Sequence, residues 1–135
     1  MEQQIMGQTF DEERALYHLQ NAEVAECRFE GPADGESVLK ETRNIVVRDS
    51  SFSLRYPLWH AHGFRLFGVT MDALTRAAIW YSSDGDIEDS VLDGIKCVRE
   101  CEAIRLNRCK VHSPEFGWRS RQLSISDSEM ESEYF

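Results

Sequence analysis

The chain repeats one pattern of apolar and turn-forming residues six times. Each copy contains an apolar residue, a second apolar residue two positions later that we call the anchor, and a large apolar residue five positions after the anchor. In the copy at residues 44–52 these are Ile45, Val47 and Phe52. The six anchors are Val24, Val47, Leu66, Ile87, Leu106 and Ile125. They lie 23, 19, 21, 19 and 19 residues apart, and a period near 20 indicates a solenoid.

The spacing inside each copy predicts short strands that are separated by tight corners. The anchor and the residue two positions before it lie on the same side of a strand. The next inward residue comes three positions after the anchor, so the chain must turn between them. Residues that tolerate a left-handed backbone mostly occupy this corner, although Glu26 and Arg108 fit less well. The corner residues are Glu26, Asp49, Gly68, Asp89, Arg108 and Asp127. A second predicted turn, three positions before the anchor, contains Asn21, Asn44, Gly63, Asp84, Ala103 and Gln122.

These features predict an all-β fold, a right-handed parallel β-helix that forms a single-stranded solenoid of about six coils. Inward aliphatic residues would stack coil on coil, and each coil would pair its backbone with the coils on either side. We assign the coils to residues 21–135, as a single domain, and residues 1–20 to an N-terminal cap, because a solenoid must cover the open end of its core. A leucine-rich repeat has a similar period, but its Leu-rich frame and Asn ladder are not present.

The other half of each coil contains the candidate binding residues. Counted back from the next anchor, one column of positions contains Leu39, Leu58, Ile79 and Val98, with Gly117 below. If this aliphatic column points inward, strand alternation predicts that the adjoining column points outward. That outward column contains Lys40, Trp59, Trp80, Arg99 and Trp118.

Indoles beside guanidinium and ammonium groups suit a saccharide or a small anionic ligand. The hypothetical ligand-binding set combines this column with flanking residues: Glu36, Lys40, Arg55, Trp59, Arg76, Trp80, Tyr81, Arg99 and Trp118. The alternative is a structural role, since stacked identical side chains stabilise solenoids and Trp beside Arg forms a cation–π pair. The favoured function is a binding or structural module.

The enzymatic alternative is a polysaccharide lyase or a glycoside hydrolase that acts in a charged groove on the Trp-bearing face. Its best available members are Glu36, Lys40, Arg55, Arg76 and Lys96. Paired carboxylates for glycoside cleavage are Glu36 with Glu41, or Glu100 with Glu115. His60 and His62 are spaced as two metal ligands on one strand face, but no third ligand has suitable spacing. We assign no catalytic residue and expect neither a metal nor a cofactor.

The composition excludes some classes of partner. The formal net charge of −9 disfavours nucleic acid, whose phosphates need a basic surface, and anionic membrane surfaces. No apolar run approaches the roughly 18 residues that a membrane span needs, and the N-terminus lacks a signal segment. The four cysteines are expected to be unpaired thiols in a reducing compartment. We therefore expect a cytoplasmic chain.

Several short motifs resemble those of a known family. They are Glu-Arg-Ala-Leu at residues 13–16, Gly-Glu-Ser-Val-Leu-Lys-Glu at 35–41, Arg-Tyr-Pro-Leu-Trp at 55–59 and Ala-Ile-Trp-Tyr at 78–81. The chain resembles the uncharacterised DUF3737 family over nearly its whole length, and that family is similar to the pectin-lyase-like β-helices. The resemblance implies a fold but no established activity, so it transfers no catalytic residue.

The resemblance also bears on assembly. Family members are longer, and the chain resembles their N-terminal half. The last coil would then expose its apolar end and its unpaired strand edges, which is a liability unless they are covered. We therefore expect a homo-oligomer, most simply a homodimer, that associates through the C-terminal coil.

Overall fold

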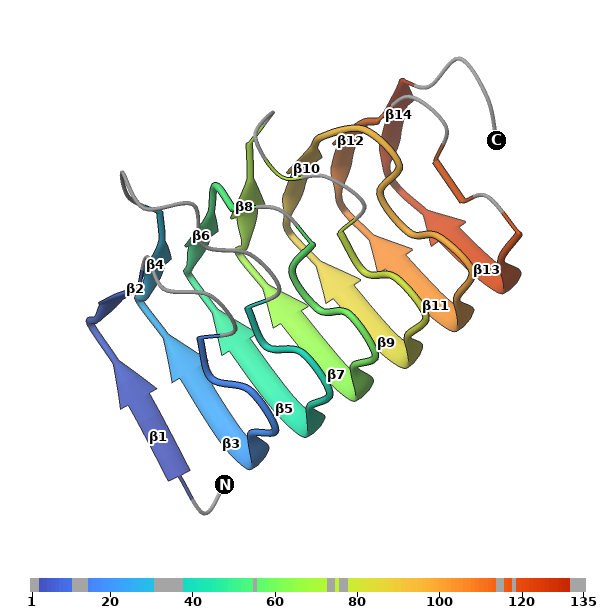
Figure 1. Cartoon of the computed structure of the whole chain (residues 1–135). Coiled ribbons are helices and arrows are strands. Elements are labelled where there is room, and N and C mark those ends of the chain that lie inside the picture. Colours follow the sequence, from blue (N-terminus) through green and yellow to red (C-terminus); the bar gives the residue numbers. More distant parts are fainter. Residues whose placement is uncertain are drawn as a thin grey trace.

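A computed structural model of the chain describes residues 3–10, 15–30, 38–54, 56–72, 75, 78–113, 116–117 and 119–131. These residues form a parallel β-helix, and Figure 1 shows its coils advancing regularly from the N-terminal to the C-terminal end. The all-β solenoid predicted from the sequence is confirmed. Within the described part of the chain, no helix is long and apolar enough to cross a membrane.

Two parallel sheets of seven strands each run along the solenoid. The long-stranded sheet contains, in spatial order, β1 (Gln3–Met6), β3 (Gln20–Ala25), β5 (Arg43–Arg48), β7 (His62–Phe67), β9 (Ser83–Glu88), β11 (Glu102–Asn107) and β13 (Arg121–Ser126). The short-stranded sheet contains β2 (Thr9–Phe10), β4 (Arg28–Phe29), β6 (Ser51–Phe52), β8 (Thr70–Met71), β10 (Val91–Asp93), β12 (Lys110–His112) and β14 (Glu129–Glu131). Equivalent positions of successive coils pair with one another, as Val24 does with Val47 and Phe29 with Phe52.

The anchors and the apolar residues five positions later fill the core of the solenoid. Five anchors are at most 1% exposed: Val24, Val47, Leu66, Ile87 and Leu106. Their partners on the other sheet are at most 3% exposed: Phe29, Phe52, Met71, Leu92 and Val111. Full burial of such a side chain contributes about 1.5–3 kcal/mol. The stacked apolar columns are therefore the main source of stability.

The backbone is left-handed at both predicted turns of every coil. At the corner two positions after the anchor, φ lies between 47° and 61° in all six copies, Glu26 and Arg108 included. Three positions before the anchor, φ lies between 51° and 74°. Asp, Asn and Gly adopt this conformation readily, whereas Glu and Arg do so at a cost. The geometry of the coil therefore imposes the turn on whichever residue occupies it.

Small polar side chains satisfy the backbone groups that these corners bury. The Ser90 hydroxyl accepts a hydrogen bond from the amide of Val69 in the preceding coil, at 3.1 Å, and donates one to the Glu88 carbonyl, at 2.8 Å. Ser50 makes the equivalent pair of contacts with Cys27 and Arg48. A buried amide without a partner costs about 1–3 kcal/mol, so the small polar slot three positions after the anchor has a structural cause.

Residues 3–10, which the sequence assigned to a cap, form the first strand of each sheet. Ile5 pairs with the anchor Val24, and Phe10 pairs with Phe29. Gly7 occupies the corner with a φ of 64°. The repeat therefore extends one coil further toward the N-terminus than its six sequence copies indicate. This first coil does not show the full apolar pattern, because the polar Gln3 occupies the position of its first apolar residue.

The last described coil is less buried than the others. Its anchor, Ile125, is 39% exposed, and Leu123 and Met130 are partly buried against the core. Residues 132–135 lie outside the described residues. Association through this coil stays a prediction.

Two of the cysteine thiols are unsuited to chemistry at neutral pH. All four are free and buried. Burial raises the pKa of Cys101 to about 11, and it raises the pKa of Cys97 as well. Since the thiolate is the form that attacks or binds a metal, these two side chains act as small apolar residues.

Candidate functional site

The third side of each coil consists of turns rather than a strand. The aliphatic column eight positions before the anchors points inward as predicted, and four of its members are fully buried with φ of 57–58°: Leu39, Leu58, Ile79 and Val98. The residues two positions later are also left-handed. Amides at these two positions donate to carbonyls of the neighbouring coils, as Ile79 does to Pro57 and Tyr81 to Arg99. The side chains of this segment are therefore directed by left-handed turns, eight and six positions before each anchor, and not by the alternation of an extended strand.

Between these turns runs a stack that we call the indole ladder, formed by Lys40, Trp59, Trp80 and Arg99. The two indole rings lie 5.4 Å apart with 12° between their planes. Lys40 Nζ lies 4.4 Å from the centroid of Trp59, and Arg99 Cζ lies 4.7 Å from the centroid of Trp80. Lys40 precedes and Arg99 follows the indoles along the solenoid. Each cation therefore covers the ring face that the other indole leaves open.

This arrangement leaves only the edges of the two indoles for a ligand. The Nε1 atoms of Trp59 and Trp80 are buried and have no hydrogen-bond acceptor among the described residues. Tyr56 packs beside both rings, at 6.4 Å and 6.2 Å. A saccharide could stack on an indole face only by displacing Lys40 or Arg99. The geometry therefore favours the structural role of the ladder.

Beside the ladder lie two adjacent hollows, at the ends where the strands of the long-stranded sheet begin. Their side chains come from the positions six and four before each anchor. The first hollow, of about 230 Å³, is lined by His18, Gln20, Glu41, Arg43, His60 and His62. The second, of about 400 Å³, is lined by His60, His62, Tyr81, Ser82, Ser83, Glu100, Cys101, Glu102, Arg119 and Arg121. The hollows share His60 and His62, so we treat them as one groove.

The groove carries no net formal charge, although the chain carries −9. Its charged residues are three glutamates and three arginines: Glu41, Glu100, Glu102, Arg43, Arg119 and Arg121. Arg43 and Arg121 have no side-chain hydrogen bond, ion pair or ring contact within the described part of the chain. The other described arginines are all engaged, for example Arg105 with Asp86 at 2.5 Å. Among the described arginines, the guanidinium groups that are open to a ligand therefore lie in the groove.

Histidines occupy the middle of the groove. The His60 ring stacks on Tyr81 at 5.2 Å and lies 6.3 Å from the His62 ring. His62 Nδ1 is 2.7 Å from Ser83 Oγ. Burial first, and then the positive charges of Arg43 and His60, lower the pKa of His62 below its usual range. His62 is therefore neutral at pH 7.

A contact with the preceding coil explains why Arg43 is not paired with Glu41. The Glu41 carboxylate accepts a hydrogen bond from the Tyr17 hydroxyl and lies 3.5 Å from His18 Nε2. The Tyr17 hydrogen bond is the main cause that lowers the pKa of Glu41. The Glu41 carboxylate therefore interacts with Tyr17 and His18 of the preceding coil, and it stays charged at neutral pH.

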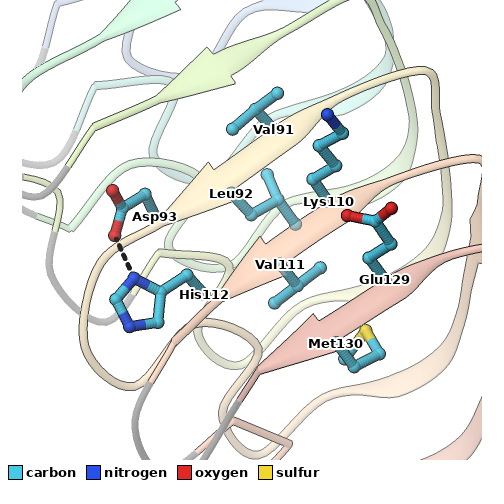
Figure 2. A pocket seen from close by; sticks show the side chains of 8 residues that line it. All are labelled: Val91, Leu92, Asp93, Lys110, Val111, His112, Glu129 and Met130. Carbon is cyan, nitrogen blue, oxygen red and sulfur yellow. Dashed lines mark ion pairs between the residues drawn. The ribbon is translucent and has the colours of Figure 1, made fainter.

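Another hollow, of about 470 Å³, lies on the short-stranded sheet over β10, β12 and β14. Figure 2 shows Lys110 and Glu129 on one side of it and the pair Asp93–His112 on the other. His112 Nδ1 lies 3.5 Å from Asp93 Oδ1. In the described residues, no group of three or more His, Cys, Asp or Glu side chains could hold a metal ion, either here or in the groove.

The predicted ligand-binding residues divide into three groups. Lys40, Trp59, Trp80 and Arg99 build the indole ladder, and Tyr81 lines the groove. The others lie outside the described residues, as does Glu115: Glu36, Arg55, Arg76 and Trp118. Sequence reasoning missed the groove itself. Its signal was the column four positions before the anchors, which is polar in every copy: Gln20, Arg43, His62, Ser83, Glu102 and Arg121.

Comparison with family models decides where the chain belongs. Residues 3–135 match the model described as "Protein of unknown function (DUF3737)". The chain belongs to this family. No curated protein matches it. Among solved structures, it is similar to QnrB1, described as a plasmid-mediated fluoroquinolone resistance protein, with 10% identity and a TM-score of 0.21 over 95% of this chain and 89% of that chain. A similarity of this size carries no argument about the DUF3737 chain.

Proposed function

We propose that this DUF3737 chain is a binding module that holds an extended anionic saccharide along the groove. One observation carries the proposal: in an acidic chain, the two described arginines without side-chain partners, Arg43 and Arg121, both line the groove. A guanidinium group binds a carboxylate through two parallel hydrogen bonds. The groove is therefore suited to a ligand with carboxylates.

The repeat of the solenoid suits a chain-like ligand. Groove side chains recur at the first residue of six of the seven strands of the long-stranded sheet, from β3 to β13, and strands lie about 4.8 Å apart. Arg43 on β5 and Arg121 on β13 are separated by three strands, β7, β9 and β11. Between the two arginines the groove offers neutral donors and acceptors, including Ser83 and Tyr81. A linear saccharide with carboxylates near both ends would meet both arginines at once.

Isothermal titration calorimetry with hexagalacturonate, which is long enough to reach from β5 to β13, tests the proposal. Arg43→Gln and Arg121→Gln should each weaken binding about tenfold, because each removes a charge-assisted hydrogen-bonding group. Arg28→Gln is the matched control, since Arg28 is exposed on β4, outside the groove, and lies 3.9 Å from Glu30. Absence of binding by the unmodified chain, or equal binding by all variants, would contradict the proposal.

The same titration distinguishes ligand binding in the groove from ligand binding on the indole ladder. Trp59→Phe keeps an aromatic ring in the stack but removes the indole edge, so it should leave the affinity for hexagalacturonate unchanged. Loss of most of the affinity in this variant would instead place the ligand on the ladder, as the sequence alone suggested. The lyase or hydrolase alternative depends on Glu36, Arg55 and Arg76, which lie outside the described residues, and it stays a prediction.

A further inference from the structure

Three of the four histidines of the chain line the groove. His18 and His60 stand on left-handed turns of the third side, and His62 is the first residue of β7. All three lie in the hollow that also contains Arg43. In a chain with so few histidines, this grouping makes the charge of one surface depend on pH near neutrality.

The charged groups around these histidines come from several elements. Glu41 lies 3.5 Å from His18 and carries the charge nearest to it. His62 is influenced by Arg43 on β5, by Asp84 on β9 and by His60. His60 stacks on Tyr81 and Trp59. The far end of the groove adds two acidic and two basic side chains, which balance: Glu100, Glu102, Arg119 and Arg121.

Protonation therefore changes the groove from neutral to strongly cationic. With neutral histidines, its three arginines balance its three glutamates. Protonated His18, His60 and His62 would add three positive charges within one hollow. We propose that the groove is an acid-strengthened anion site, in which protonation of these histidines tightens the binding of a carboxylate or sulfate group. The identity of the ligand rests on the proposed function, whereas the histidine switch does not.

The environment of His62 supports tighter anion binding at low pH. Its pKa is lowered by burial and by Arg43, so in the free protein it gains its charge only below the usual histidine range. A bound anion would offset both causes and raise the pKa of His62. By linkage, a ligand that raises this pKa must itself bind more tightly when His62 is protonated.

Titrations at two pH values test the switch. Sulfate and hexagalacturonate serve as probes at about pH 7.5 and about pH 5.5, on either side of the ordinary histidine pKa, because both keep their charge over this range. Binding to the unmodified chain should tighten about tenfold at the lower pH. The double variant His60→Gln, His62→Gln should lose most of this gain. His112→Gln, which changes the histidine outside the groove, should keep it.

Nuclear magnetic resonance of the histidine rings gives a second readout that needs no variant. Added sulfate should raise the pKa of His62 in the unmodified chain and leave that of His112 unchanged. Equal affinities at the two pH values, or an unaltered gain in the double variant, would overturn the switch.

The two proposals fail in different ways. Sulfate binding that depends on the histidines, without any hexagalacturonate binding, would reject the saccharide and support the switch. Hexagalacturonate binding that depends on Arg43 and Arg121 but not on pH would support the saccharide and reject the switch. Absence of binding by both probes at both pH values would reject both.

Discussion

Each coil has a sheet side, formed by its strands, and a turn side, formed by the turns that carry the indole ladder. Both sides bury apolar side chains in the core, but with different backbone conformations. On the sheet side, Val47 and its equivalents bury extended residues between hydrogen-bonded strands, and surface charges pair with each other, as Arg105 does with Asp86. On the turn side, Ile79 and Val98 bury side chains of similar size from a left-handed backbone. The groove, with Arg43 and Arg121, lies where the two sides meet.

The difference shows that packing, rather than local preference, holds the turn side in place. A left-handed residue other than glycine costs roughly 1–2 kcal/mol, and branched side chains such as Ile and Val are the least suited to it. Hydrogen bonds to both neighbouring coils and full burial offset that cost. The sheet side carries no such strain at its anchors. Substitutions should therefore affect the two sides by different mechanisms.

Charge at an anchor should have the largest effect. Val47→Asp places a carboxylate at a position that is 0% exposed, with neighbours Val24 and Leu66 above and below it. An uncompensated buried charge costs about 3–5 kcal/mol, so several coils should open. Urea denaturation measures the loss. Thr70→Asp, on the exposed face of β8, is the control and should change stability little. An unchanged midpoint for Val47→Asp would contradict the inward assignment of the anchors.

A smaller loss of stability is expected when a side chain is added at Gly85, which packs against the large ring of Phe64 in the core. A Cβ atom on Gly85 would lie 2.2 Å from the ring of Phe64 in the preceding coil. Gly85→Ala should therefore destabilise the fold by about 1–3 kcal/mol through overpacking. Phe64→Leu makes room, so the double variant should be less destabilised than the sum of the two single changes. Simple additivity in thermal denaturation would show that the two positions do not share this space.

The sheet side could be predicted from the sequence because its signal is local and repeated. Anchors such as Val47, the corner at Asp49 and the small slot at Ser50 recur at fixed spacing, and each has one physical reason for its residue type. These features were enough to predict the fold class, the length of the repeat and the residues that point into the core. The first coil was missed, since Gln3 interrupts the apolar frame at Ile5.

The turn side and the groove were harder to predict. Nothing in Leu58 or Ile79 indicates a left-handed backbone, because the conformation comes from the neighbouring coils rather than from the residue. The stacking of Lys40, Trp59, Trp80 and Arg99 in one column followed from the repeat, but the choice between ligand binding and cation–π pairing required coordinates. Whether Arg43 is paired depends on the contact of Glu41 with Tyr17, and sequence spacing does not encode that contact.

Two glutamates two positions apart test the backbone difference with the smallest expected effect. Glu100 stands on the turn side with a φ of 49°, whereas Glu102 begins β11 and is exposed. Glycine relieves the left-handed strain at position 100 but loses more conformational freedom on folding. Glu100→Gly should therefore be close to neutral, because relief of the left-handed strain is offset by loss of the partly buried contact with Arg99 at 3.7 Å. Glu102→Gly removes a side chain from a strand and should destabilise by about 0.5–1 kcal/mol. Thermal denaturation of the two variants side by side measures the difference. Equal losses would mean that the turn at Glu100 carries no strain, and that the two sides of the coil differ in shape alone.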